Sequence, residues 1–138
     1  MKIVVDTNCL LACFSKKSPY RWLFNAILNG HLTLAFTTDI LLEYEEIVSK
    51  RTSPEVARSL IKLLIDLRTK EQVEVHYFWN LITQDTDDNK FVDCAIAANA
   101  DYLITHDGHY KVLKEMDFPK VSIATLPEFA TIFDNKAQ

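Results

Sequence analysis

The chain has 138 residues, of which 49% are hydrophobic and 25% charged, and its formal net charge is −4. This composition is ordinary for a globular protein, and a total of two Gly and four Pro excludes a disordered or loop-rich chain. The length fits one domain, which we expect to span residues 1–138. No apolar run is long enough to span a bilayer and residues 1–6 are too short for a signal peptide, so we expect a cytoplasmic protein with no membrane partner.

The negative charge weakly disfavours nucleic acid as a partner, because proteins that bind phosphate usually carry a basic surface. Acids that hold Mg²⁺ lower the net charge while their ions attract phosphate, so the objection is not decisive. The three cysteines, Cys9, Cys13 and Cys94, form no C-x-x-C pair and indicate small buried side chains in a reducing compartment. Because Cys9 and Cys13 are four residues apart, they would share one face of a helix.

The predicted elements begin with a strand at Ile3–Val5, a short β-branched run typical of a buried parallel strand. A helix is predicted over Pro19–Asn29, with Ser18 as its N-cap and Gly30 at its C-terminal stop. A second strand follows at Leu32–Phe36.

Thr38 is suited to cap the next helix, which the apolar spacing carries to about Lys50. Ser53 begins a further helix in the same way, and its apolar stripe reaches Leu67. Val73–Tyr77 is predicted as the third strand.

A polar loop at residues 84–89 leads into an Ala-rich helix. The remaining pattern predicts, in order, the helix Lys90–Ala100, the strand Tyr102–Thr105, the short helix Tyr110–Met116, the strand Val121–Ala124 and the helix Pro127–Phe133. Strands that alternate with helices indicate an α/β fold with a parallel sheet and helices on both faces. Such sheets bind ligands outside the carboxyl ends of their strands, where Asp6 and Asp107 are expected.

Several acids that converge at one edge of a sheet suit metal-assisted cleavage of a phosphodiester. Mg²⁺ takes a few carboxylates and keeps several waters, and such a site activates water and neutralises charge at phosphorus. Asp6 is the strongest candidate, because it ends a buried strand and is followed by Thr7 and Asn8, which can orient it; the alternative is a helix N-cap. Periodicity leaves Glu43 and Glu45 open, since they lie at opposite borders of one apolar helix face.

Asp93 lies early in a largely apolar helix, so it is either a site residue or a surface acid that the helix dipole stabilises. Asp107 is either a site residue or a turn acid. Asp85, Asp87 and Asp88 are expected in a solvated loop, where Asp88 is the one placed to assist the site.

Two histidines offer a rival metal site. His106 and His109 flank Asp107 and would suit Zn²⁺ or Mn²⁺, although a polar turn explains them equally well.

Four fragments of the sequence carry a family resemblance. They are IVVDTN at 3–8, LLEY at 41–44, DTDDNKFVDCA at 85–95 and ADYLITHD at 100–107. In this order they resemble PIN domains, most closely the PIN-family toxins of bacterial toxin–antitoxin pairs. The resemblance covers nearly the whole chain. The residues around Asp107 depart from the family pattern, since His106 and Gly108-His109-Tyr110 are unusual there.

The resemblance implies a Rossmann-like three-layer sandwich with strand order 3-2-1-4-5, and RNA cleavage that depends on Mg²⁺ or Mn²⁺. It assigns the catalytic and metal-binding acids as Asp6, Glu43, Asp93 and Asp107, which resolves the choice between Glu43 and Glu45. Asn8, Asp88 and Thr105 are expected to support them. It also implies an antitoxin partner and a homodimer.

We therefore expect a ribonuclease whose products carry a 5′-phosphate and a 3′-hydroxyl. The basic residues expected to guide the RNA backbone are Lys16, Lys17, Arg21 and Lys90. The alternative is a non-catalytic scaffold that binds RNA or protein. A phosphatase of the haloacid-dehalogenase type is a further alternative, but it requires a second acid two residues after Asp6, where the chain has Asn8.

Overall fold

The computed structural model describes residues 1–137, which fold around a five-stranded parallel sheet. Its strands are β1 (Lys2–Val5), β2 (Thr33–Phe36), β3 (Lys70–Gln72), β4 (Tyr102–Ile104) and β5 (Ile123–Ala124). They lie in the order β3-β2-β1-β4-β5, with every neighbouring pair parallel. The predicted α/β class and strand order are confirmed.

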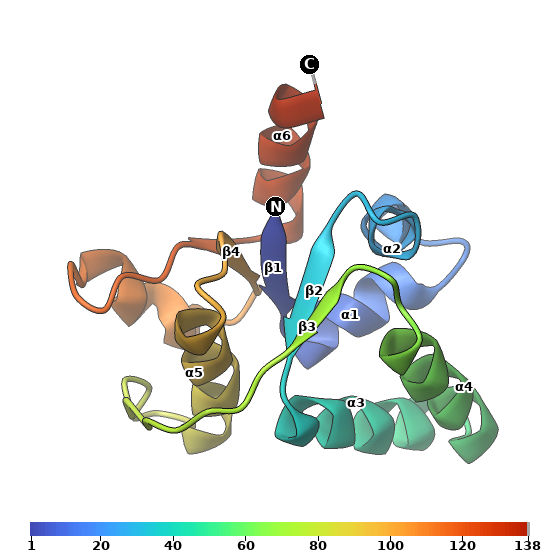
Figure 1. Ribbon diagram of the computed structural model, residues 1–138, viewed down its shortest axis with the longest axis horizontal. Helices are drawn as coiled ribbons and strands as arrows, with labels where there is room; N and C mark the ends of the chain where they lie inside the picture. The colour runs from blue at the N-terminus through green and yellow to red at the C-terminus, as the bar shows by residue number, and fades with distance from the viewer. Residues whose placement is uncertain (138) are drawn as a thin grey trace.

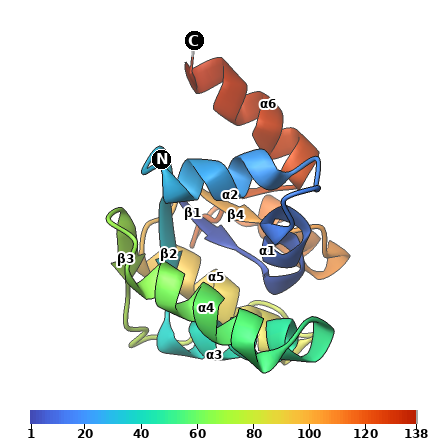
Figure 2. The same cartoon turned by 90° about the vertical axis from the view of Figure 1, so that its right-hand side faces the viewer.

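Helices cover both faces of the sheet. The α-helices are α1 (Thr7–Phe14), α2 (Arg21–Leu28), α3 (Thr38–Arg51), α4 (Pro54–Ile65), α5 (Asn89–Ala97) and α6 (Leu126–Ala137), and two 3₁₀ segments are η1 (Thr86–Asp88) and η2 (Gly108–Glu115). In Figure 1, α5 lies on one side of the sheet and α1, α2 and α4 on the other, while Figure 2 shows α6 extending away from the layers. None of the helices in residues 1–137 has the length and apolar content required to cross a membrane.

The core forms where the sheet meets these helices. Ile3, Val4 and Val5 are completely buried, as the β-branched run predicted. Tyr44 of α3 is also buried, and its hydroxyl donates a hydrogen bond to the carbonyl of Val5. This bond fixes α3 against the end of β1, one residue before Asp6.

Local capping and turn hydrogen bonds explain where three of the helices begin. Ser53 caps α4 as predicted, accepting from the Val56 amide at 3.2 Å. Thr37, not Thr38, caps α3, since its hydroxyl accepts from the Ile40 amide at 3.1 Å. The helix predicted from Pro19 begins instead at Arg21, because the preceding residues form a turn in which the Ser18 hydroxyl accepts from the Tyr20 amide.

Gly30 follows the C-cap of α2, at the end of the helix, as predicted. Its φ of +80° is a conformation that glycine adopts without steric cost. The helix α1 was not assigned from the sequence, although Cys9 and Cys13 do share its buried face.

The third strand was predicted in the wrong place. β3 covers Lys70–Gln72, and the alternating segment 73–77 leaves the sheet. The Val73 amide still donates to the Phe36 carbonyl at 2.9 Å. β2 ends at Phe36, so the residues beyond Val73 have no neighbouring strand to pair with, and Tyr77 is 66% exposed.

Candidate active site

The site is built at the carboxyl ends of β1 and β4, which lie side by side. Asp6 directly follows β1, and its amide donates to the Ile104 carbonyl at 3.0 Å. Thr105 directly follows β4, and its hydroxyl donates to Asp6 Oδ2 at 2.9 Å. The same hydroxyl accepts from the Asp107 amide at 3.0 Å, so Thr105 joins two of the predicted acids, Asp6 and Asp107.

Asp6 is a buried carboxyl group, with 7% of its surface exposed. Burial raises its pKa to about 6, and the charges of Asp88 and Glu43 act in the same direction. Hydrogen bonds from Thr105 and from the Thr7 amide oppose this rise. A carboxyl group that is buried beside other acids gains stability when a cation joins it.

Glu43 reaches the site from α3. The Thr7 hydroxyl donates to Glu43 Oε2, and Lys90 Nζ lies 2.9 Å from Glu43 Oε1. The Thr7 side chain therefore positions Glu43, a role that the sequence did not predict, while its backbone amide bonds to Asp6. Asn8 is exposed on α1, and no side-chain hydrogen bond joins it to Asp6 within the described residues.

Asp88 and Asp107 meet at a histidine. His109 Nδ1 lies 3.2 Å from Asp88 Oδ2 and 3.3 Å from Asp107 Oδ1, and the His109 amide donates to Asp107 at 2.9 Å. Burial raises the pKa of Asp88, and the charges of Asp107 and Asp85 raise it further, against a hydrogen bond from His109. The carboxylates of Asp88 and Asp107 therefore both lie close to the same imidazole nitrogen.

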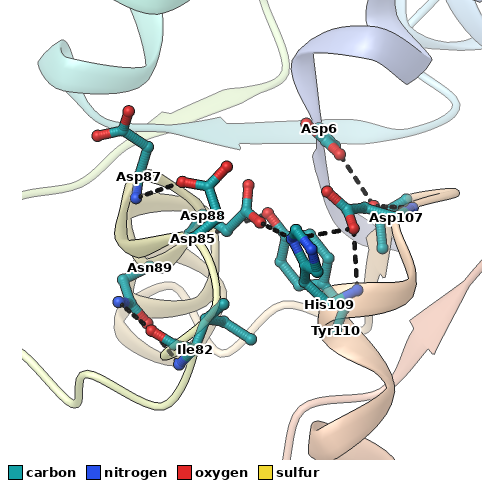
Figure 3. Close-up of polar contacts among 10 residues, drawn as sticks. Asp6, Ile82, Asp85, Asp87, Asp88, Asn89, Asp107, His109 and Tyr110 are labelled. Atoms are coloured by element: carbon teal, nitrogen blue, oxygen red, sulfur yellow. Dashed lines mark hydrogen bonds and ion pairs between the residues drawn. The ribbon is translucent and has the colours of Figure 1, made fainter.

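Tyr110 lies among the acids, as Figure 3 shows. Its hydroxyl donates to the Asp88 carbonyl at 3.3 Å. Burial raises the pKa of Tyr110, and the charges of Asp6, Asp88 and Asp107 add to that effect. The buried phenol thus lies close enough to three carboxylates for their charges to act on it, a relationship that periodicity alone does not reveal.

Asp93 takes a different position from the other predicted acids. Its side chain is 4% exposed, and Oδ1 accepts from the Trp79 amide at 3.2 Å. Asn89, one helical turn earlier, accepts from the Ile82 amide at 2.8 Å and donates to the Ile82 carbonyl at 2.9 Å. These two side chains hold the segment 79–82 against α5. The acids that the structure brings together are Asp6, Glu43, Asp88 and Asp107.

A further group of possible metal ligands lies at the same edge. Asp85, Asp88 and His109 each offer an atom, and these atoms lie within 4.8 Å of one another. Carboxylate oxygens suit Mg²⁺, and one imidazole nitrogen also suits Mn²⁺. His106 is exposed and is not a member of this group, so among the described residues the alternative metal site would contain His109 without His106.

The four basic residues predicted to guide RNA lie in different local surroundings. Lys16 and Lys17 are exposed beyond the end of α1. Arg21 instead donates to the Phe14 carbonyl and to Asn25, and its guanidinium lies 4.7 Å from the ring centre of Phe24. Lys90 pairs with Glu43 beside the acids.

A model of the PIN domain matches residues 2–109 of the sequence. The chain belongs to the PIN domain family. The PIN match contains all of the acids described above, and it ends before β5 and α6. No protein in a curated collection matches the sequence significantly.

Two solved structures share the PIN fold of this chain. One is VapBC2 from Rickettsia felis bound to a promoter DNA fragment, with a TM-score of 0.62 and 20% sequence identity. The other is DNA-bound VapBC from Salmonella typhimurium, with a TM-score of 0.55 and 14% identity. Each comparison covers 91% of this chain and 98% of the other chain, so the likeness extends over the whole fold.

Proposed function

We propose that the protein is a metal-dependent endoribonuclease, in which Asp6, Glu43, Asp88 and Asp107 form the active site. The observation that carries this proposal is Asp6, a carboxyl group buried at the ligand-binding edge of a PIN sheet beside two further acids. A site of this kind favours a divalent cation over water alone, because the cation offsets the repulsion between the carboxylates.

Asp6, Asp88 and Asp107 are the residues that would hold Mg²⁺ or Mn²⁺. When bound, the ion supplies a Lewis acid that activates water and neutralises charge on the phosphate. Through its two hydrogen bonds, the Thr105 hydroxyl holds the Asp6 carboxylate close to the Asp107 backbone amide. Asp88 takes the place predicted for Asp93, because Asp88 shares its surroundings with Asp107 and His109 whereas Asp93 bonds to Trp79.

Glu43 completes the group from α3. Its two oxygens are held by Thr7 and Lys90, so the carboxylate is already oriented before any substrate arrives. Lys90 lies at the rim of the acids, where its charge would attract a phosphate of the RNA backbone. We propose no direct RNA contact for Lys16 and Lys17. They follow the end of α1, which extends roughly 12 Å from Asp6.

We also propose a biological role for the protein. The resemblance to PIN-family toxins, together with VapBC assemblies as structural neighbours, supports a toxin of a toxin–antitoxin pair with an antitoxin as protein partner. We extend this to a cytoplasmic homodimer. In this setting, the antitoxin would cover the acidic edge and exclude RNA.

Cleavage of a mixed RNA pool tests the proposal. The wild type and Asp6→Asn are compared in Mg²⁺, in Mn²⁺ and in EDTA, with Asp134→Asn as a control for loss of one exposed acid on α6. We expect the wild type and the control to cleave only with metal, and Asp6→Asn to lose at least about 100-fold in rate. Binding of RNA without metal-dependent cleavage would instead identify a scaffold, and cleavage that survives Asp6→Asn would place the active site elsewhere.

A further inference from the structure

A cavity of about 480 Å³ adjoins the proposed active site. Lys90 lines this cavity and also pairs with Glu43, so the two features meet at one side chain. The volume falls within the roughly 300–1,000 Å³ typical of sites for small molecules. The walls come from the start of α3, the segment 73–80 and the first turns of α5.

The charge of the walls disfavours a phosphate as the occupant. Asp39, Glu74 and Asp93 line the cavity, against one lysine, Lys90. Acids of this kind instead accept hydrogen bonds from neutral N–H groups. The exposed ring of Phe78 lies on the same wall and presents a flat apolar surface, on which a nucleobase can stack.

Asp93 is the most strongly fixed of these acids. Its Oδ1 is occupied by the Trp79 amide, whereas Oδ2 accepts no hydrogen bond from any residue in the described range 1–137. The neighbouring wall is fixed as well, since Asn89 holds Ile82 through two hydrogen bonds. One oxygen of a buried carboxylate is thereby left available to a donor in the cavity.

We propose that this cavity binds the base of a nucleotide next to the scissile phosphate, and that Asp93 selects a base with an exocyclic amino group. Cytosine, adenine and guanine each carry such a donor, whereas the base edge of uracil offers a single ring N–H between two carbonyl oxygens that a carboxylate repels. A pocket that combines stacking with a hydrogen-bond acceptor is a common way to read an unpaired base. This proposal rests on the proposed ribonuclease function and names the part of the RNA that the site recognises.

The variant Asp93→Asn tests the assignment sharply. An asparagine keeps an oxygen for the Trp79 amide, but it turns an NH₂ donor toward the cavity in place of an acceptor. The preference for amino-bearing bases should therefore weaken or reverse while the wall keeps its shape. Asp134→Asn is the matched control, since it removes the same charge from an exposed position on α6.

The first readout is cleavage in Mn²⁺ of RNA oligonucleotides that differ in one base beside the cut. We expect the wild type and Asp134→Asn to disfavour uracil at one flanking position by at least about fivefold, and Asp93→Asn to lose that preference. Identical base profiles in all three proteins would overturn the proposal and would leave the cavity to a protein partner.

The second readout separates this proposal from the proposed function, because it needs no cleavage. Binding of cytidine and of uridine is followed by tryptophan fluorescence in the absence of metal. We expect cytidine to bind more tightly than uridine to the wild type, with the difference lost in Asp93→Asn. If Asp93→Asn fails to fold, Phe78→Ala replaces it and should weaken cytidine binding, because Phe78 is 66% exposed on the wall. Equal binding of the two nucleosides by the wild type would overturn the cavity assignment, even if RNA is cleaved.

Discussion

Thr105 donates a hydrogen bond to Asp6 at 2.9 Å, although 99 residues of sequence separate them. The bond joins the ends of two adjacent parallel strands and stabilises the ionised form of a buried carboxyl group. The same hydroxyl accepts a hydrogen bond from the Asp107 amide, so the Thr105 side chain positions both acids.

Replacing Thr105 with valine should therefore raise the pKa of Asp6 above about 6. We expect Mn²⁺ affinity to fall about tenfold or more near pH 6 and by less near pH 8, because metal binding requires ionised Asp6. Titration calorimetry at the two pH values measures this difference. Thr105→Ser should restore the wild-type pH dependence, whereas an equal loss at both pH values in the valine variant would contradict the role given to the hydroxyl.

The metal-free protein should lose stability as the pH rises. The folded pKa of Asp6 is raised to about 6 from a usual value of 3.8, so its contribution is fully present below about pH 4 and is lost as the pH rises through 6. The shift corresponds to about 2–3 kcal/mol in the free energy of unfolding. Urea unfolding in EDTA should show a smaller pH dependence for Asp6→Asn than for the wild type. If the two proteins show the same pH dependence, the pKa of Asp6 is not raised in the folded protein.

His109 should influence which metal the site prefers. Its imidazole lies within 3.3 Å of carboxylate oxygens of Asp88 and Asp107, and nitrogen ligands favour Mn²⁺ over Mg²⁺. We expect His109→Ala to reduce the ratio of activity in Mn²⁺ to activity in Mg²⁺ by several-fold. His106→Ala, which removes an exposed imidazole nearby, is the control. An unchanged ratio in His109→Ala would mean that the ring contacts no ion.

The three cysteines should be inert in the folded protein. Cys9, Cys13 and Cys94 are buried, and burial raises the pKa of each thiol to about 12, so the reactive thiolate is scarce near neutral pH. A chromogenic disulfide reagent at pH 8 should label none of them until denaturant is added, when all three should react. Rapid labelling under native conditions would show that one of these helices opens readily.

Much of the fold was predictable because its signals are local. The Ile3–Val5 run, the Ser53 cap and the positions of Asp6 after β1 and Asp107 in the turn after β4 all depend on short segments. β3 was misplaced because its position depends on a partner. The segment after Gln72 alternates apolar and polar residues, as a strand does. However, β2 ends at Phe36, so this segment has no neighbouring strand to pair with.

Our proposal of Asp88 in place of Asp93 rests on a feature that a one-dimensional pattern does not contain. Five residues along an α-helix turn the side chain by roughly 140°, so the two acids face different surroundings. Asp88 lies at the start of α5, facing His109, whereas Asp93 lies under the segment that contains Trp79. Only the path of the 79–82 segment, which no sequence period encodes, distinguishes them.

Direct binding of Mn²⁺ tests the central claim, and it is best measured by the loss of the free-ion signal in electron paramagnetic resonance. The comparison uses the wild type, Asp88→Asn and Asp87→Asn, since Asp87 is an exposed neighbour that points away from His109 in Figure 3. We expect the wild type and Asp87→Asn to bind Mn²⁺ alike, and Asp88→Asn to bind at least about tenfold more weakly. Equal binding by all three proteins, or no binding by the wild type, would contradict a metal centre built on Asp6, Asp88 and Asp107.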